Sequence, residues 1–150
     1  MRPRGGNYLA DDMPLFKAAG VDVLVSALGE KEVRDNWLGT CGDHCSTAGI
    51  EFVHFPIPNL FTPEYETALP RMRELASHVA EGRGVAVHCF AGVGRSPTIA
   101  ASMLVLLGID PEDAWERVRA ARQVELPDTK AQYRWVLGIP EFVAAAAAGR

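Results

Sequence analysis

The sequence predicts an α/β domain in which a central, mostly parallel sheet is flanked by helices. Short apolar segments rich in β-branched residues alternate with longer segments whose apolar residues recur every three or four positions. Such alternation is typical of parallel strands joined by helical crossovers. The 150 residues suit one domain, and an apolar fraction of 48% is ordinary for a globular protein. We therefore expect a single domain over residues 1–150, with a tail at 144–150 that either extends the last helix or frays.

Four segments are predicted as strands because they are short, apolar and bounded by turn-forming residues. They are residues 7–10, 21–25, 50–56 and 85–87.

The helices are predicted from apolar spacing and from start and stop signals. Pro70 leaves open where the helix predicted at 64–80 begins, because a proline there either kinks the helix or marks a later start. Three tryptophans, at positions 37, 115 and 135, are expected in the core or between helices. The predicted helices span residues 11–19, 30–38, 64–80, 97–107 and 129–143. A further helix is predicted to start at Asp110 and Pro111, the clearest start signal, and to reach at least Ala121.

One stretch, from His88 to Ser96, carries most of the functional information. It reads His-Cys-Phe-Ala-Gly-Val-Gly-Arg-Ser and lies between the predicted strand at 85–87 and the predicted helix at 97–107. A strand, a tight glycine-containing loop and a helix N-terminus form an anion site, because the backbone N–H groups converge on one point. We expect the amides of the loop to bind phosphate: Phe90, Ala91, Gly92, Val93, Gly94 and Arg95.

The side chains of this stretch indicate nucleophilic chemistry on that anion. Cys89, at a helix N-terminus and near Arg95, is expected to have a depressed pKa and to act as a thiolate. Arg95 offers a planar fork of donors for two phosphoryl oxygens. Ser96 can donate a hydrogen bond to the sulfur when it leaves phosphorus, and His88 is expected to brace the loop rather than to transfer protons.

The motif His88-Cys89, five residues, Arg95-Ser96 resembles the signature of the protein tyrosine phosphatase superfamily, in the small dual-specificity branch. The resemblance extends from about residue 5 to residue 136. It implies a cysteine phosphatase fold and a phosphomonoesterase that works through a phosphocysteine intermediate, with no metal and no cofactor. It also implies a phosphorylated protein or a small aryl phosphate as the substrate.

A second segment departs from the family pattern. In the family, a loop reading Pro-x-Pro-Asp carries the aspartic acid that protonates the leaving oxygen, whereas residues 56–59 here end in Asn59. General acid catalysis is typically worth about 10²- to 10⁴-fold, so this position predicts a slow enzyme. Three explanations stay open: another acid serves (Glu64, Glu66 or Asp128), the enzyme works without an acid on good leaving groups, or the protein binds phosphoproteins with little turnover.

Asp128 stands where many family members have a glutamine that positions the hydrolytic water. It precedes Thr129 and Gln132, which the family pattern retains. Asp128 is therefore a candidate to orient or activate water or to substitute as the acid. The alternative is that its side chain caps the helix predicted at 129–143.

The remaining features narrow the class of protein. A net charge of −4 argues against nucleic acid and anionic membranes as partners, and the sequence has no apolar run long enough to span a bilayer. Residues 1–6 are too short and polar for a signal peptide. A thiolate enzyme also needs a reducing compartment, so we expect a cytoplasmic protein. We also expect it to be a monomer. Cys41, His44 and Cys45 have no second ligand pair for zinc, although Cys41 or Cys45 could form a redox pair with Cys89.

The sequence thus predicts a phosphatase for protein phosphotyrosine, with phosphoserine and phosphothreonine as further substrates. Tyrosine's phenol has a pKa of about 10, far below that of an alkyl alcohol, so an acid-poor site favours aryl esters. The alternative is a phosphoprotein-binding pseudophosphatase with little turnover.

Overall fold

A three-stranded parallel sheet forms the centre of the computed structural model, which describes residues 2–149. The middle strand is β1 (Val23–Ser26), with β2 (Glu51–His54) on one side and β3 (Val85–His88) on the other. Both pairings are parallel, and Val23 lies opposite Glu51 in β2 and Val85 in β3. The predicted fold class, a parallel sheet flanked by helices, is confirmed.

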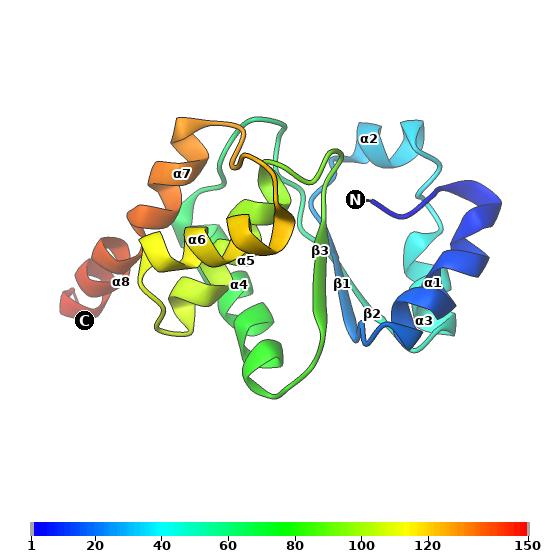
Figure 1. Ribbon diagram of the computed structural model, residues 1–150, viewed down its shortest axis with the longest axis horizontal. Helices are drawn as coiled ribbons and strands as arrows, with labels where there is room; N and C mark the ends of the chain where they lie inside the picture. The colour runs from blue at the N-terminus through cyan, green and yellow to red at the C-terminus, as the bar shows by residue number, and fades with distance from the viewer. Residues whose placement is uncertain (1, 150) are drawn as a thin grey trace.

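The helices form one layer on each face of this sheet (Figure 1). The layer on one face is built by η1 (Gly6–Tyr8), α1 (Leu9–Ala18), α2 (Glu30–Asp35) and α3 (Cys41–Thr47). The layer on the other face is built by α4 (Tyr65–Ala80), α5 (Arg95–Leu106), α6 (Pro111–Arg122), α7 (Lys130–Leu137) and α8 (Ile139–Ala148). Within residues 2–149, no helix is both long enough and apolar enough to cross a bilayer.

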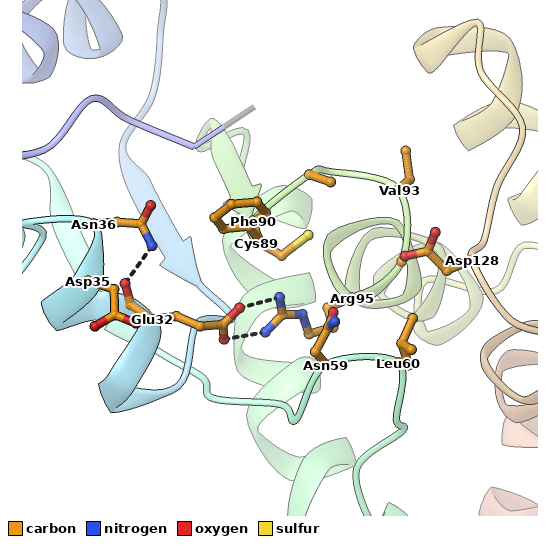
Figure 2. A pocket seen from close by; sticks show the side chains of 12 residues that line it. Glu32, Asp35, Asn36, Asn59, Leu60, Cys89, Phe90, Val93, Arg95 and Asp128 are labelled. Atoms are coloured by element: carbon orange, nitrogen blue, oxygen red, sulfur yellow. Dashed lines mark hydrogen bonds and ion pairs between the residues drawn. The ribbon is translucent and has the colours of Figure 1, made fainter.

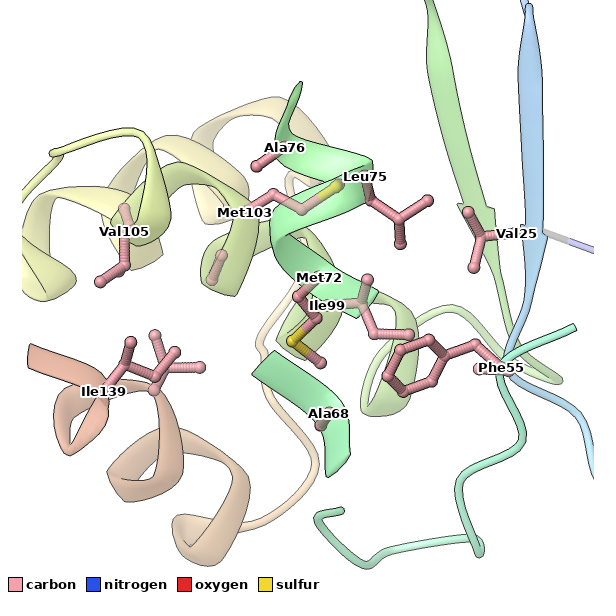
Figure 3. Close-up of a cluster of buried hydrophobic side chains, with 14 of the residues drawn as sticks. Val25, Phe55, Ala68, Met72, Leu75, Ala76, Ile99, Met103, Val105 and Ile139 are labelled. Carbon is pink, nitrogen blue, oxygen red and sulfur yellow. The ribbon is translucent and has the colours of Figure 1, made fainter. Parts of the chain in front are cut away.

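The alternation of side chains along β1 separates two apolar cores. Val23 and Val25 point into the larger core, beside α4 and α5, whereas Leu24 points into the smaller core with α1 and α3. Figure 3 shows the larger core, where Val25 points toward Leu75 of α4. Because both faces of the sheet are covered, β1 and β3 are mainly apolar along their length, whereas the edge strand β2 begins and ends with exposed polar residues, Glu51 and His54.

Two predicted elements differ from the structure. Residues 7–10 are not a strand; they form part of η1 and the start of α1. Leu9 and Met13, four residues apart, are both fully buried, which is the period of a helix and not of a strand. The single helix expected at 129–143 is two helices that meet at Gly138, where a Cβ would lie 2.4 Å from the Tyr65 hydroxyl oxygen.

Two further expectations are settled in detail. Pro70 lies inside α4, which begins before it at Tyr65. Trp115 and Trp135 are buried, but Trp37 is 77% exposed in a left-handed conformation with a φ of 56°. Trp37 is therefore not a core residue, contrary to the expectation.

The parallel arrangement brings three loops to one end of the sheet. The segment after β1 leads into α2, the segment after β2 carries Asn59, and the segment after β3 carries Cys89. In parallel α/β sheets, ligands bind at the carboxyl ends of the strands. The fold therefore places residues that lie far apart in the sequence around one site.

Candidate active site

The loop from Cys89 to Gly94 connects β3 to α5 and encloses the Cys89 sulfur. The Gly92 backbone N–H donates to Cys89 Sγ at 3.3 Å, and the Ser96 hydroxyl lies 3.3 Å from the same sulfur. Gly92 has a φ of +80°, a conformation in which a side chain would be strained. The turn that directs its N–H at the sulfur therefore depends on glycine.

These contacts make Cys89 more acidic than an ordinary thiol. Burial of the side chain opposes ionisation, but the hydrogen bonds from Ser96 and Gly92 and the charge of Arg95 outweigh it. The pKa of the Cys89 thiol consequently lies below its usual value, as the sequence predicts. The sulfur is therefore prepared to act as a nucleophile.

Arg95, the first residue of α5, is almost fully buried and is held by α2 and by the segments that follow β1 and β2. Its Nη1 donates to Glu32 Oε2 at 2.7 Å and its Nη2 to Glu32 Oε1 at 2.8 Å. Nη1 also donates to the carbonyl oxygen of Ile57 at 3.1 Å and, at 3.4 Å, to that of Ala27. Apart from an interaction of the guanidinium with the Cys89 thiol, no hydrogen bond within residues 2–149 involves Nε, so the guanidinium keeps an edge for two oxygens of an anion.

Glu32 is the functional residue that the sequence analysis missed. Its side chain is 30% exposed, while that of its partner Arg95 is only 2% exposed, and the pair lowers the pKa of Glu32. The hydrogen bonds from Arg95 are the main cause, burial opposes them, and the Gly29 N–H adds to them. A buried arginine requires a counter-charge, but no local pattern indicates which of the 19 acidic residues supplies it.

A cavity of about 460 Å³ opens above the Cys89 sulfur and is lined from all three strand ends (Figure 2). It brings Cys89, Arg95, Asn59 and Asp128 together, as the sequence predicts. Glu64 and Glu66, the other acids considered, are not among its lining residues. The lining consists of Glu32, Asp35, Asn36, Asn59, Leu60, Cys89, Phe90, Ala91, Val93, Gly94, Arg95 and Asp128.

Most of the predicted phosphate-binding loop faces this cavity. Phe90, Ala91, Val93 and Gly94 line it, while Gly92 is absent from the lining and directs its N–H at the sulfur. The Gly92 carbonyl accepts a hydrogen bond from Arg122 Nη2 at 3.2 Å, which fixes the loop to α6.

Asp128 does not cap α7, which corrects the alternative considered for it. Thr129 is the cap: its hydroxyl accepts from the Gln132 N–H at 3.1 Å, and its own N–H donates to Gln132 Oε1 at 3.3 Å. The Thr-x-x-Gln spacing is the sequence signature of such a capping box and would have identified it. Asp128 instead lies against the loop, with its Oδ2 2.6 Å from the point where a Cβ on Gly94 would lie.

His88 is buried directly before the nucleophile. Its Nδ1 lies 3.5 Å from the Cys89 carbonyl oxygen, and its Nε2 has no partner in the described part of the chain. Burial lowers the pKa of His88 to about 4, with positive charge nearby as a smaller cause. The bracing role expected for His88 stays a prediction, since Nε2 makes no hydrogen bond to any described residue that would hold the loop.

The other two cysteines lie in the smaller core, on the other face of the sheet from the core that contains Cys89. Cys41 and Cys45 belong to α3, and Cys45 Sγ lies 3.3 Å from Met13 Sδ. Cys89 packs in the larger core, and all three cysteines are free thiols. This arrangement does not favour a redox pair with Cys89. No group of three metal-ligating side chains occurs between residues 2 and 149.

Comparison with known proteins agrees with the geometry. Residues 1–109 match the family described as "Tc-R-P: Polymorphic toxin system, DSP-PTPase phosphatase". Cyclin-dependent kinase inhibitor 3 of Homo sapiens is 32% identical over 127 residues, which cover 83% of this chain and 60% of that protein. The Rattus norvegicus protein of that name is 34% identical over 90 residues, 59% of this chain and 42% of that protein. The chain thus spans about two to three fifths of these relatives.

Two solved structures share the fold. A kinase associated phosphatase whose catalytic-site cysteine is replaced by serine has a TM-score of 0.80 and 26% identity, covering 91% of this chain and 78% of that one. Tk-PTP in its active form has a TM-score of 0.70 and 29% identity, covering 85% of this chain and 82% of that one.

Proposed function

This chain belongs to the DSP-PTPase phosphatase family of phosphoric monoester hydrolases, and from that premise we propose that it hydrolyses protein phosphotyrosine through a phosphocysteine intermediate. The observation that carries the proposal is the acidic Cys89 thiol at the floor of a cavity beside a buried arginine with one free edge. The substrate is a phosphorylated protein or a small aryl phosphate.

In the first step, the Cys89 thiolate attacks the phosphorus atom in line with the ester oxygen. The S–P bond forms, the P–O bond breaks, and its electron pair leaves on the phenolate oxygen. The free edge of Arg95 and the loop amides hold the three remaining oxygens and stabilise the charge that spreads over them.

Ser96 acts in the second step, when sulfur leaves phosphorus. Its hydroxyl lies 3.3 Å from Cys89 Sγ, and the Gly92 N–H reaches the same atom. Two hydrogen bonds to the sulfur stabilise the thiolate that forms and lower the barrier to its departure.

Because Asn59 is not an acid, phosphotyrosine is expected to be a better substrate than phosphoserine or phosphothreonine. Asn59 lines the cavity at the position of the expected acid, but a carboxamide has no proton to transfer. A phenolate leaves with little help, since its conjugate acid has a pKa of about 10, whereas an alkoxide does not. The reaction is therefore expected to be slow, and slower still on phosphoserine.

The mouth of the cavity also fits an aromatic ring. Phe90 and Leu60 line it and are 48% and 52% exposed, a high exposure for apolar side chains. Such side chains can enclose a phenyl ring above the sulfur. The reducing environment that a free thiolate requires supports a cytoplasmic location.

Replacing the nucleophile tests the proposal. We expect Cys89→Ser to abolish release of phosphate from a phosphotyrosine peptide, while Cys41→Ala, a change at a cysteine outside the site, retains it. A chelator should leave the activity intact. Full activity of Cys89→Ser would refute the mechanism.

The missing acid at Asn59 favours one alternative, a phosphoprotein-binding pseudophosphatase. Incubation with excess phosphotyrosine peptide separates the two functions. Many phosphates released per protein indicate an enzyme, whereas stoichiometric binding without release indicates the pseudophosphatase.

A further inference from the structure

We propose that Asp128 accepts the proton of the water molecule that hydrolyses the phosphocysteine intermediate. This inference rests on the proposed function and assigns a catalytic residue to its second step. Asp128 would act in a cavity where the residue at the acid position, Asn59, cannot exchange protons.

The first argument is position. Asp128 lines the same cavity as Cys89 and Arg95, on the side opposite α2 (Figure 2). Its Oδ2 lies so close to Gly94 that a Cβ there would be 2.6 Å away. Gly94 is the last residue of the phosphate-binding loop, so the carboxylate stands beside the space that a phosphoryl group on Cys89 would occupy.

The second argument is that the carboxylate of Asp128 is free. Three carboxylates line the cavity, and two of them have partners: Glu32 is bound by Arg95, and Asp35 is paired with Lys31. No hydrogen bond or ion pair reaches the side chain of Asp128 from any other described residue. Since Thr129 caps α7, the Asp128 carboxylate does not cap the helix either.

The third argument is that the side-chain amides near Asp128, those of Gln132 and Asn59, cannot accept the proton of the water molecule. Gln132 is fully buried, its Oε1 accepts from the Thr129 N–H at 3.3 Å, and its Nε2 donates to the Phe61 carbonyl at 3.4 Å. Both of its polar atoms are thus occupied. Asn59 can hold a water molecule by hydrogen bonds but, as a carboxamide, does not accept its proton.

Hydrolysis of the phosphocysteine transfers the phosphoryl group to water and regenerates the thiolate. The water oxygen attacks phosphorus opposite the sulfur, and one water proton moves to an Asp128 carboxylate oxygen. The P–S bond breaks, and its electron pair returns to Cys89 Sγ, where Ser96 and Gly92 stabilise the thiolate. Inorganic phosphate leaves, and Asp128 then releases the proton to solvent.

With this assignment, only the second of the two chemical steps has a residue that transfers a proton. The first step proceeds without an acid and is controlled by the leaving group, whereas the second step has a base. Removing the Asp128 carboxylate should therefore slow only the second step, so that the phosphocysteine accumulates.

Rapid-quench measurements with ³²P-labelled p-nitrophenyl phosphate test this inference, because that leaving group needs little protonation. We expect Asp128→Asn to release p-nitrophenol in a burst of about one per active site, at the wild-type rate. Breakdown of the labelled phosphoenzyme should then be slower by about 10²-fold or more. Asp128→Glu is the second variant and should retain much of the breakdown rate, because it keeps a carboxylate that can accept the proton.

Glu64→Gln is the control, since it removes a carboxylate that does not line the cavity. It should leave the phosphoenzyme fraction at the wild-type level. An unchanged phosphoenzyme fraction and unchanged turnover in Asp128→Asn would overturn the inference. A slower burst without accumulation of the phosphoenzyme would also overturn it, because Asp128 would then be the acid of the first step. A wild-type protein that forms no phosphoenzyme would instead refute the proposed function.

Discussion

Replacing Glu32 with glutamine would remove the negative charge that balances the buried guanidinium of Arg95. The Glu32 carboxylate accepts hydrogen bonds from both Nη atoms of Arg95 and, through Oε2, from the Gly29 N–H at 3.0 Å. A glutamine has similar volume and retains one acceptor oxygen, but it places an NH₂ group where the second oxygen stood. The substitution therefore tests charge and hydrogen bonding with little change in packing.

The magnitude follows from the burial of the two partners. Breaking a fully buried ion pair by removing one partner costs about 3–5 kcal/mol. Here the Glu32 side chain is 30% exposed, and Arg95 keeps the carbonyl of Ile57, so we expect a loss of about 2–3 kcal/mol in the free energy of unfolding. For a chain of this size, that loss lowers Tm by about 4–12 °C.

Thermal and denaturant unfolding measure this loss, with Glu30→Gln as the matched control. Glu30 lies on the same helix, but its side chain is 87% exposed and pairs only with Arg34 at 3.8 Å, so its loss should cost less than about 0.5 kcal/mol. Because Arg95 would no longer be fixed, kcat/KM of Glu32→Gln should also fall by about 10- to 100-fold. Unfolding and activity equal to those of the control would show that the backbone carbonyls alone position Arg95.

The pH dependence provides a second signature of the pair. Arg95 lowers the pKa of Glu32 in the folded protein, so the stabilisation is present above the unfolded pKa of about 4.3 and is lost as pH falls through the folded value. The stability difference between wild type and Glu32→Gln should therefore shrink in acid. A difference that stays constant down to strongly acidic pH would contradict this account.

Two further predictions concern the site. Asn59→Asp should raise kcat on phosphotyrosine by up to about 10²-fold, and less on p-nitrophenyl phosphate, because it restores a proton donor; equal gains on both substrates would contradict that reason. Burial lowers the pKa of His88 to about 4, so the unfolded chain binds a proton that the folded chain does not. The free energy of unfolding should then decrease by up to roughly 3 kcal/mol as pH falls from about 6.5 to about 4, and His88→Asn should lose this slope; identical slopes would show that His88 does not cause it.

The parts of the fold that could be predicted from the sequence are those held by contacts between near neighbours. The segment from β3 through the loop to α5 was recognisable because its strand, glycines and helix start lie within a few residues of one another. The start of α6 was equally local: Asp110 accepts from the Glu112 N–H at 2.9 Å, and Pro111 occupies the first turn. In both cases, the structure of the segment depends on contacts among its own residues, so a short stretch of sequence is enough to predict it.

One error at a helix end had a local signal, and another came from a tertiary contact. Gly138 is followed by Pro140, which lies in the first turn of α8 and has no N–H to donate to the preceding helix. The Tyr65 hydroxyl from α4 then packs where a side chain at position 138 would lie. The exposure of Trp37 likewise depends on the path of the N-terminal segment, whose Gly6 N–H donates to the Trp37 carbonyl at 2.7 Å. Composition and periodicity describe neither of these contacts.

The sequence by itself identified the nucleophile, the arginine and the position of the missing acid, because each lies in a short pattern with a local chemical reason. Only the tertiary structure paired Arg95 with Glu32 and placed a free Asp128 carboxylate beside Gly94. Glu32 is 63 residues from Arg95 along the chain, and the parallel sheet brings them together at the ends of its strands. A buried charge must find a partner, but the choice of that partner depends on which loops the fold brings within hydrogen-bonding distance.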